Sequence, residues 1–201
     1  MNKETYQTIT KPSTGFFKDK GSKFIAYAKP VKSINEITEH LEYIKKEHHS
    51  ARHHCWAYRI GFRGEEYRMQ DDGEPINSAG KPILGQIDAF SLTQILIVVV
   101  RYFGGTLLGV GGLIQAYKQA SKDALKSAHI KTQHIPYPIH ILCAYEHYPH
   151  IMNILSGNNC TIYNEEYNNT RCKIDCEVDK PTLILLEREK NLYTSLKIKL
   201  S

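Results

Sequence analysis

Apolar residues in the first two thirds of the chain recur with strand-like and helix-like periods in turn. Alternating apolar positions predict a strand over residues 22–31. Apolar residues at spacings of three and four then predict a helix over 33–48, with a serine cap at its start. Two further strands are expected over 54–60 and 66–70, with glycines in the turn between them.

The longest aliphatic run lies near the middle of the chain. Residues 95–100 are all isoleucine, leucine or valine, which predicts a central strand over 93–103 covered on both faces. A short helix over 83–90 is expected before this strand. A glycine-rich segment, 104–112, follows the strand and leads into a predicted helix over 113–128.

The remaining residues follow a different order. Two prolines within 133–138 indicate a boundary, so the sequence predicts two domains, 1–133 and 134–201. In the second domain the pattern predicts strand, helix, strand, strand, helix and strand over residues 139–145, 149–157, 160–167, 170–178, 181–190 and 192–200. This βαββαβ order is typical of a small ferredoxin-like sandwich, and the whole chain is expected to be α+β.

Composition narrows the class of protein. Hydrophobic residues make up 41% of the chain and the mean hydropathy is −0.42, as in globular proteins with a packed core. The longest aliphatic run has six residues, against roughly 20 needed to cross a bilayer, so we expect no membrane association. The N-terminus lacks a secretory signal pattern and the five cysteines form no C-x-x-C pair. We therefore expect a cytoplasmic protein with reduced thiols and with no cofactor or metal.

Positive charge is concentrated in the first predicted domain. Residues 1–133 hold 19 Lys and Arg against 13 Asp and Glu, whereas residues 134–201 hold 7 against 8. An excess of this kind is typical of proteins that bind a polyanion such as nucleic acid, and it is also common on ordinary solvated surfaces.

The glycine-rich segment is the first candidate site. Glycines between a buried strand and a helix N-terminus can leave several backbone N–H groups free to bind one anion. The alternative is that they only permit tight turns and close packing. A P-loop is excluded because its lysine is missing. The candidate anion-binding or nucleic-acid-binding residues are Arg101, Tyr102, Gly104, Gly105, Gly109, Gly111, Gly112, Lys81 and His54.

A second candidate is a cleft formed by His53, Asp71, Asp72 and Glu74. Three carboxylates in four positions can bind a hard cation or act as acid and base, with His53 or His54 as a general base. The alternative is a polar turn held by side-chain hydrogen bonds to the backbone. The spacing matches neither an EF-hand nor a zinc helix, so no metal site is assigned.

Four motifs in one order resemble the YigZ/IMPACT family. They are A-R-H-H-C-W-A at 51–57, D-D-G-E-P at 71–75, A-G-K-P at 79–82 and the string from R-Y-F-G-G to G-G-L at 101–113. The resemblance implies a first domain like domain two of ribosomal protein S-five. It implies a second, ferredoxin-like domain like the C-terminal domain of elongation factor G.

The resemblance also bears on function. Eukaryotic IMPACT proteins regulate translation initiation by competing for a ribosome-associated activator of an initiation-factor kinase. They carry an additional N-terminal RWD domain for which residues 1–20 leave no room, so the kinase pathway is not transferred to this chain.

Three functions remain as hypotheses. The first is a non-enzymatic protein that binds RNA or the ribosome through the first domain and is linked to the regulation of translation. The second is a metal-dependent hydrolase or phosphotransfer enzyme that uses the acidic and histidine motifs. The third is a protein-interaction module that binds a protein partner through residues 134–201.

Overall fold

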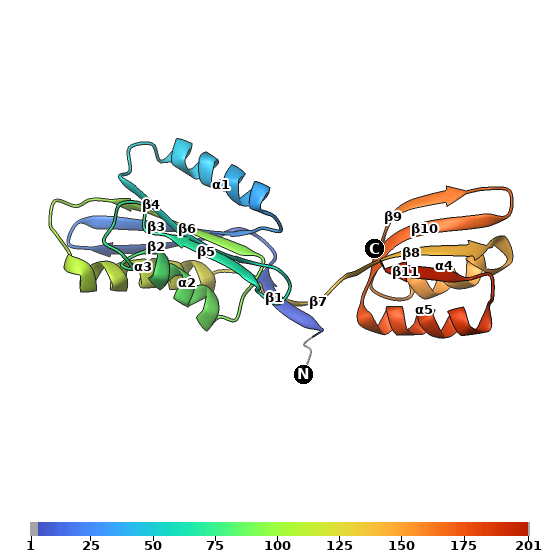
Figure 1. Cartoon of the computed structure of the whole chain (residues 1–201). Coiled ribbons are helices and arrows are strands. Elements are labelled where there is room, and N and C mark those ends of the chain that lie inside the picture. Colours follow the sequence, from blue (N-terminus) through green and yellow to red (C-terminus); the bar gives the residue numbers. More distant parts are fainter. Residues whose placement is uncertain (1–3, 201) are drawn as a thin grey trace. The chain divides into compact units, whose positions relative to one another are not determined.

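The computed structural model describes residues 4–200 and has an α+β fold, as the sequence predicts. The chain divides into two compact units (Figure 1). Residues 5–133 form the N-terminal unit, and residues 134–200 form the C-terminal unit together with Glu4. Within residues 4–200, no helix is long and apolar enough to span a membrane.

The N-terminal unit is built on a five-stranded sheet in the order β2-β3-β6-β4-β5, and neighbouring strands are antiparallel. The strands are β2 (Ser13–Asp19), β3 (Ser22–Pro30), β4 (His53–Ile60), β5 (Glu66–Gln70) and β6 (Ile95–Tyr102). Helix α1 (Ile34–Glu47) covers one face, and α2 (Gly80–Ala89) and α3 (Gly109–Lys126) cover the other (Figure 1).

Strand β6 supplies side chains to both cores of this unit. Its odd-numbered residues from 95 to 99 pack against α2 and α3, and its even-numbered residues from 96 to 100 pack under α1. The prediction of a central strand covered on both faces is confirmed, since residues 95–101 are all buried. Arg101 is the one charged residue of β6, and it lies on the face covered by α2 and α3.

Helix α1 begins as its sequence predicts. The Ser33 hydroxyl accepts a hydrogen bond from the Glu36 backbone N–H, and the Glu36 carboxylate accepts one from the Lys32 N–H. The Ser33 hydroxyl satisfies one backbone donor that the first turn leaves without a helical partner, and Glu36 satisfies the donor of Lys32 just before the helix. Its apolar face then buries Ile37 and Ile44 against the sheet.

Three strands have no clear signal in the sequence. Strands β1 (Thr5–Ile9) and β7 (Ile130–His134) pair with each other in a separate two-stranded sheet. Strand β2 is an edge strand, and most of its residues are partly or fully exposed. Strands with so few buried side chains lack the alternation that identifies a strand in a sequence.

The C-terminal unit has the predicted ferredoxin-like order. Its elements are β8 (Tyr137–Ala144), a short 3₁₀ turn η1 (Tyr145–His147), α4 (Tyr148–Ser156), β9 (Cys160–Tyr167), β10 (Arg171–Val178), α5 (Lys180–Leu192) and β11 (Lys197–Leu200). The strands lie in the order β11-β8-β10-β9 and are antiparallel throughout. Alternate strand residues and both helices enclose one apolar core.

Gly15 gives the first test of this architecture. A Cβ atom at Gly15 would overlap the backbone of α3 at Ala120 and Ala124, so the Gly15→Ala variant must move the helix away from β2. We expect it to lower the free energy of unfolding by about 3 kcal/mol, measured by urea denaturation. The matched control is Gly85→Ala in α2, where a Cβ atom has no neighbour within 4 Å. This control should gain about 0.5–1 kcal/mol through helix propensity. Equal stabilities of the two variants would contradict the close contact.

Candidate functional site

A pocket of about 470 Å³ opens in the N-terminal unit where β6 ends and α3 begins. Its polar lining consists of Arg52, His53, Glu74 and Arg101. Its wall is largely apolar and comes from Phe103 and from residues between 107 and 113. A few polar groups that converge within an apolar wall are typical of a small-ligand site.

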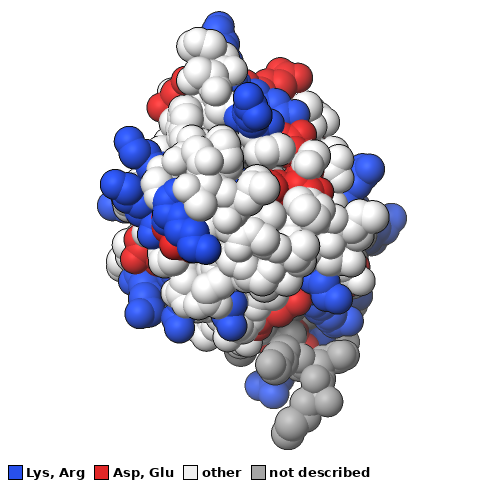
Figure 2. Space-filling model, turned by 90° about the vertical axis from the view of Figure 1, so that its left-hand side faces the viewer, with Lys and Arg blue, Asp and Glu red and all other residues white. Residues whose placement is uncertain are grey.

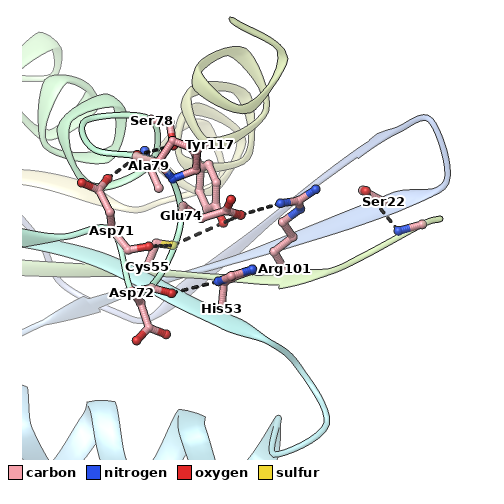
Figure 3. Close-up of polar contacts among 12 residues, drawn as sticks. Ser22, His53, Cys55, Asp71, Asp72, Glu74, Ser78, Ala79, Arg101 and Tyr117 are labelled. Carbon is pink, nitrogen blue, oxygen red and sulfur yellow. Dashed lines mark hydrogen bonds and ion pairs between the residues drawn. The ribbon is translucent and has the colours of Figure 1, made fainter. Parts of the chain in front are cut away.

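The base of the pocket is a buried ion pair. Arg101 Nη1 donates to Glu74 Oε1 over 2.6 Å, and the two side chains are only 7% and 4% exposed. The Tyr117 hydroxyl, from α3, donates to the same carboxylate oxygen over 2.8 Å (Figure 3). The pair therefore joins β6, the loop before α2, and α3.

Only one edge of the Arg101 guanidinium is used by this pair. Among residues 4–200, neither Nε nor Nη2 has a hydrogen-bond partner, and Nε is fully buried. The guanidinium carbon lies 5.6 Å from the ring centres of both Phe24 and Phe103. A buried donor without a partner costs about 1–3 kcal/mol, which marks this edge as a place where a ligand oxygen would be stabilised.

Behind the ion pair lies a thiol that stays protonated. The Cys55 Sγ lies 3.3 Å from the Tyr117 hydroxyl and 2.9 Å from the Asp71 carbonyl oxygen. Burial raises the pKa of Cys55 and the pKa of Tyr117 far above their ordinary values. Because the thiolate is the nucleophilic form, Cys55 is a core residue and not a nucleophile.

His53 lines the pocket, and a backbone carbonyl orients its ring. Its Nδ1 lies 2.8 Å from the Asp72 carbonyl oxygen. Because a carbonyl can only accept a hydrogen bond, Nδ1 carries the proton.

The N-terminus of α3 forms the wall opposite the sheet. The helix begins four residues earlier than its sequence predicts, because Gly109, Gly111 and Gly112 belong to its first turn instead of to a loop. Gly109 has a φ of +71°, which favours glycine. The N-cap residue, Leu108, offers no side-chain hydrogen bond to the first-turn amides. An 18-residue helix therefore presents its partial positive charge and free N–H groups at Gly109 and Val110, which line the pocket.

The acidic motif does not form the predicted cleft. The Asp71 carboxylate accepts hydrogen bonds from the backbone N–H groups of Asn77, Ala79 and Gly80, and so caps α2. The Asp72 carboxylate accepts from the His54 N–H and points away from Glu74 (Figure 3). Of the four predicted cleft residues, the structure brings His53 and Glu74 into one pocket, and leaves the Asp71 and Asp72 carboxylates outside it. Within residues 4–200, no three His, Cys, Asp or Glu side chains are grouped for a metal ion.

Two of the candidate binding residues, Tyr102 and His54, lie on the face of the sheet that α1 covers, opposite to Arg101. The Tyr102 hydroxyl bonds His48 Nδ1 over 2.8 Å, and His48 Nε2 lies 2.6 Å from the Tyr27 hydroxyl. His54 Nε2 lies 3.2 Å from the His48 carbonyl oxygen. Successive strand residues point to opposite faces, so Tyr102 points away from its neighbour Arg101.

Five other candidates also lie outside the pocket lining, namely Gly104, Gly105, Lys81, Gly111 and Gly112. The Gly104 N–H donates to the Ser22 hydroxyl, and a Cβ atom at Gly104 would overlap the backbone of Gly21. Gly104 therefore permits a close approach of two loops, as the packing alternative proposed. Gly105 and Lys81 are exposed, and neither belongs to the residues that line the pocket.

Two side chains of the pocket lining, Arg52 and Phe103, and two that contact the ion pair, Tyr117 and Phe24, are not among the candidates from the sequence. Arg52 and Phe103 lie inside the two motifs that flank the pocket, beside residues that were chosen. Tyr117 lies in α3 and Phe24 lies in β3. Both contact the ion pair only because the fold brings these elements together, which no local sequence pattern indicates. Strand alternation could have identified Phe103 as the aromatic on the same face as Arg101.

Comparisons with known proteins give consistent results. The sequence model of the Impact N-terminal domain matches residues 20–125. The IMPACT family member YigZ of Escherichia coli is 33% identical over 82% of this chain and 81% of its own length. An IMPACT family member of Haemophilus influenzae is 43% identical, and the alignment covers 53% of each chain, so about half of that relative is matched. A crystal structure described as an hypothetical protein superposes with a TM-score of 0.76 at 28% identity and covers 97% of this chain and 96% of its own.

Asp71 allows a test of the capping role. We expect the Asp71→Ala variant to lower the free energy of unfolding by about 1–3 kcal/mol, because three backbone donors at the start of α2 lose their acceptor. The loss should be equal with and without Mg²⁺ in urea denaturation. Glu42→Ala, at an exposed position of α1, is the control and should change stability little. Stabilisation of the unsubstituted protein by Mg²⁺ that disappears in Asp71→Ala would instead support a cation site.

His54 allows a test by pH. Burial lowers the pKa of His54 from its ordinary value of 6.5. The unfolded chain then binds this proton more readily than the folded chain, so stability falls as the pH drops below about 6.5. We expect the His54→Gln variant to lose less stability than the unsubstituted protein between about pH 7 and about pH 5. The control is His49→Gln, at an exposed position, which should follow the unsubstituted protein. Parallel pH curves for all three proteins would contradict the assignment.

Proposed function

The chain belongs to the IMPACT family, and from this premise we propose that it is a non-enzymatic, cytoplasmic RNA-binding protein that acts on translation. The N-terminal unit makes the contact, at the end where β6 stops and α3 starts. The observation that carries the proposal is the uncapped N-terminus of α3, which presents free backbone donors beside Arg52. Backbone amides at a helix start and an arginine are two of the groups that commonly bind nucleic-acid phosphates.

The surface around this end supports the proposal. Figure 2 shows the corresponding face of the molecule, where Lys and Arg side chains, with fewer Asp and Glu side chains among them, border a largely uncharged area. Residues 1–133 as a whole also carry a surplus of six positive charges, which favours binding of a polyanion. A basic border attracts the phosphate backbone, and an uncharged centre leaves room for bases.

The aromatic contact is assigned to Phe103. Phe103 is 44% exposed and borders the pocket, whereas the Tyr102 hydroxyl bonds His48 under α1. Aromatic rings beside a basic surface stack on unpaired bases without strong sequence preference. Lys81, exposed in the first turn of α2, adds a phosphate contact outside the pocket.

The proposal is tested with a fluorescently labelled single-stranded RNA, whose binding is followed by anisotropy at about 50 and about 200 mM salt. We expect affinity to fall as salt rises, and Arg52→Ala to weaken binding by about 3-fold to 10-fold, with a shallower salt dependence. The matched control is Lys126→Ala, which also removes one positive charge, but in the last turn of α3. That position lies about 25 Å from Gly109 along the helix, at 1.5 Å per residue. Absence of RNA binding at the lower salt concentration would overturn the proposed function.

A further inference from the structure

The free edge of Arg101 points to a specific ligand group. A guanidinium has two edges that can each bind a pair of oxygen atoms, and Glu74 occupies only Nη1. The Nε and Nη2 hydrogens lie side by side in a fixed fork, and neither has a partner among residues 4–200. A phosphate or carboxylate can bind both at once. Arg101 lines the pocket, whereas its Nε is fully buried, so a ligand that binds both atoms must displace the side chains that cover Nε.

Charge and donor directions favour a phosphate monoester over a carboxylate. The charges of Arg101 and Glu74 cancel, which leaves Arg52 and the positive end of α3 to attract a ligand. Donors therefore come from the sheet, from the start of α3 and from the start of β4. A phosphate monoester has three terminal oxygens for three directions, whereas a carboxylate has two.

The apolar wall indicates what the phosphate is attached to. Phe103, Leu107 and Val110 are 44%, 81% and 53% exposed at the rim, more apolar surface than inorganic phosphate could contact. The pocket volume of about 470 Å³ is also far larger than one phosphate requires. A nucleoside, with a flat and largely apolar base, suits this wall.

The depth of Arg101 restricts the ligand further. Its side chain is only 7% exposed, so the phosphate oxygens must enter the pocket to reach it. An internal phosphodiester has a nucleoside on each side and has only two oxygens free. A phosphate at the end of a strand has three free oxygens and one attached nucleoside.

We propose that the pocket binds a nucleoside phosphate monoester, presented as the phosphorylated end of an RNA strand. This inference rests on the proposed function, and it adds the chemical group that the site selects. Arg101 binds two phosphate oxygens through Nε and Nη2, the first-turn amides of α3 bind the third, and Phe103 contacts the base. The same chemistry is present in a free nucleoside monophosphate, so the experiment separates the two sources.

The experiment compares one RNA sequence with a 5′-phosphate, a 3′-phosphate or hydroxyls at both ends, by anisotropy at fixed salt. We expect one of the phosphorylated strands to bind about tenfold more tightly than the hydroxyl strand. Adenosine monophosphate should compete with it, whereas adenosine should not. The Arg101→Lys variant keeps the charge without the fork and should abolish the preference.

A second variant guards against a folding defect in Arg101→Lys. Gly111 lies in the first turn of α3, is exposed, and has no neighbour within 4 Å of a Cβ atom. The Gly111→Asp variant places a negative charge at a helix start, which stabilises the helix and repels a phosphate. We expect it to unfold no more easily than the unsubstituted protein, yet to lose the preference for phosphorylated ends. The isosteric Gly111→Asn variant is the control and should keep that preference.

The outcomes separate this inference from the proposed function. Salt-dependent RNA binding with no preference for a terminal phosphate and no competition by adenosine monophosphate would overturn the inference alone. Binding of adenosine monophosphate that depends on Arg101, without binding of any RNA strand, would overturn the RNA end as the source and the proposed function with it. An unchanged preference in Gly111→Asp would contradict the placement of the phosphate at the start of α3.

Discussion

The buried pair between Arg101 and Glu74 is the interaction on which the site depends. Charges removed from water are tolerated only when each has a partner, and loss of either partner typically costs 3–5 kcal/mol. Glu74 meets this requirement from a loop, Arg101 from the end of β6, and Tyr117 from the middle of α3. Three segments that are far apart in the sequence are therefore held at one point. The cap that Asp71 forms on α2 fixes the same loop from its other side.

The parts of the fold that the sequence predicts are those with a strong local pattern. Strand β6 is apolar without interruption, α1 has both an apolar face and a capping serine, and the order of elements after residue 137 is regular. Strands β1 and β7 escape prediction because each is stabilised by pairing with a segment more than 100 residues away. The predicted start of α3 is four residues too late for another reason. Glycine disfavours a helix interior because it loses the most backbone entropy there, so a run of glycines predicts a loop, whereas Gly109, Gly111 and Gly112 lie in the first turn of α3.

The candidate site was predicted in part. The motif around Arg101 does border a pocket, and His53 and Glu74 lie in it. The sequence alone could have shown that Tyr102 does not share a face with Arg101, since neighbours on a strand point to opposite faces. The role of Asp71 could not, because its three backbone partners come six to nine residues later and depend on how the loop folds. A carboxylate that binds backbone N–H groups and a carboxylate that binds a cation look the same in a sequence.

The contact between Gly15 and α3 has a consequence for the cost of binding. The C-terminal half of α3 rests directly on the backbone of β2, and Tyr117 ties the middle of the helix to Glu74. These two contacts fix the rotation of the helix about its axis and its position along that axis. The core therefore sets the direction of the first-turn amides. The donors are therefore preorganised. The conformational entropy of orienting them is lost during folding, and a ligand that arrives later does not have to supply it.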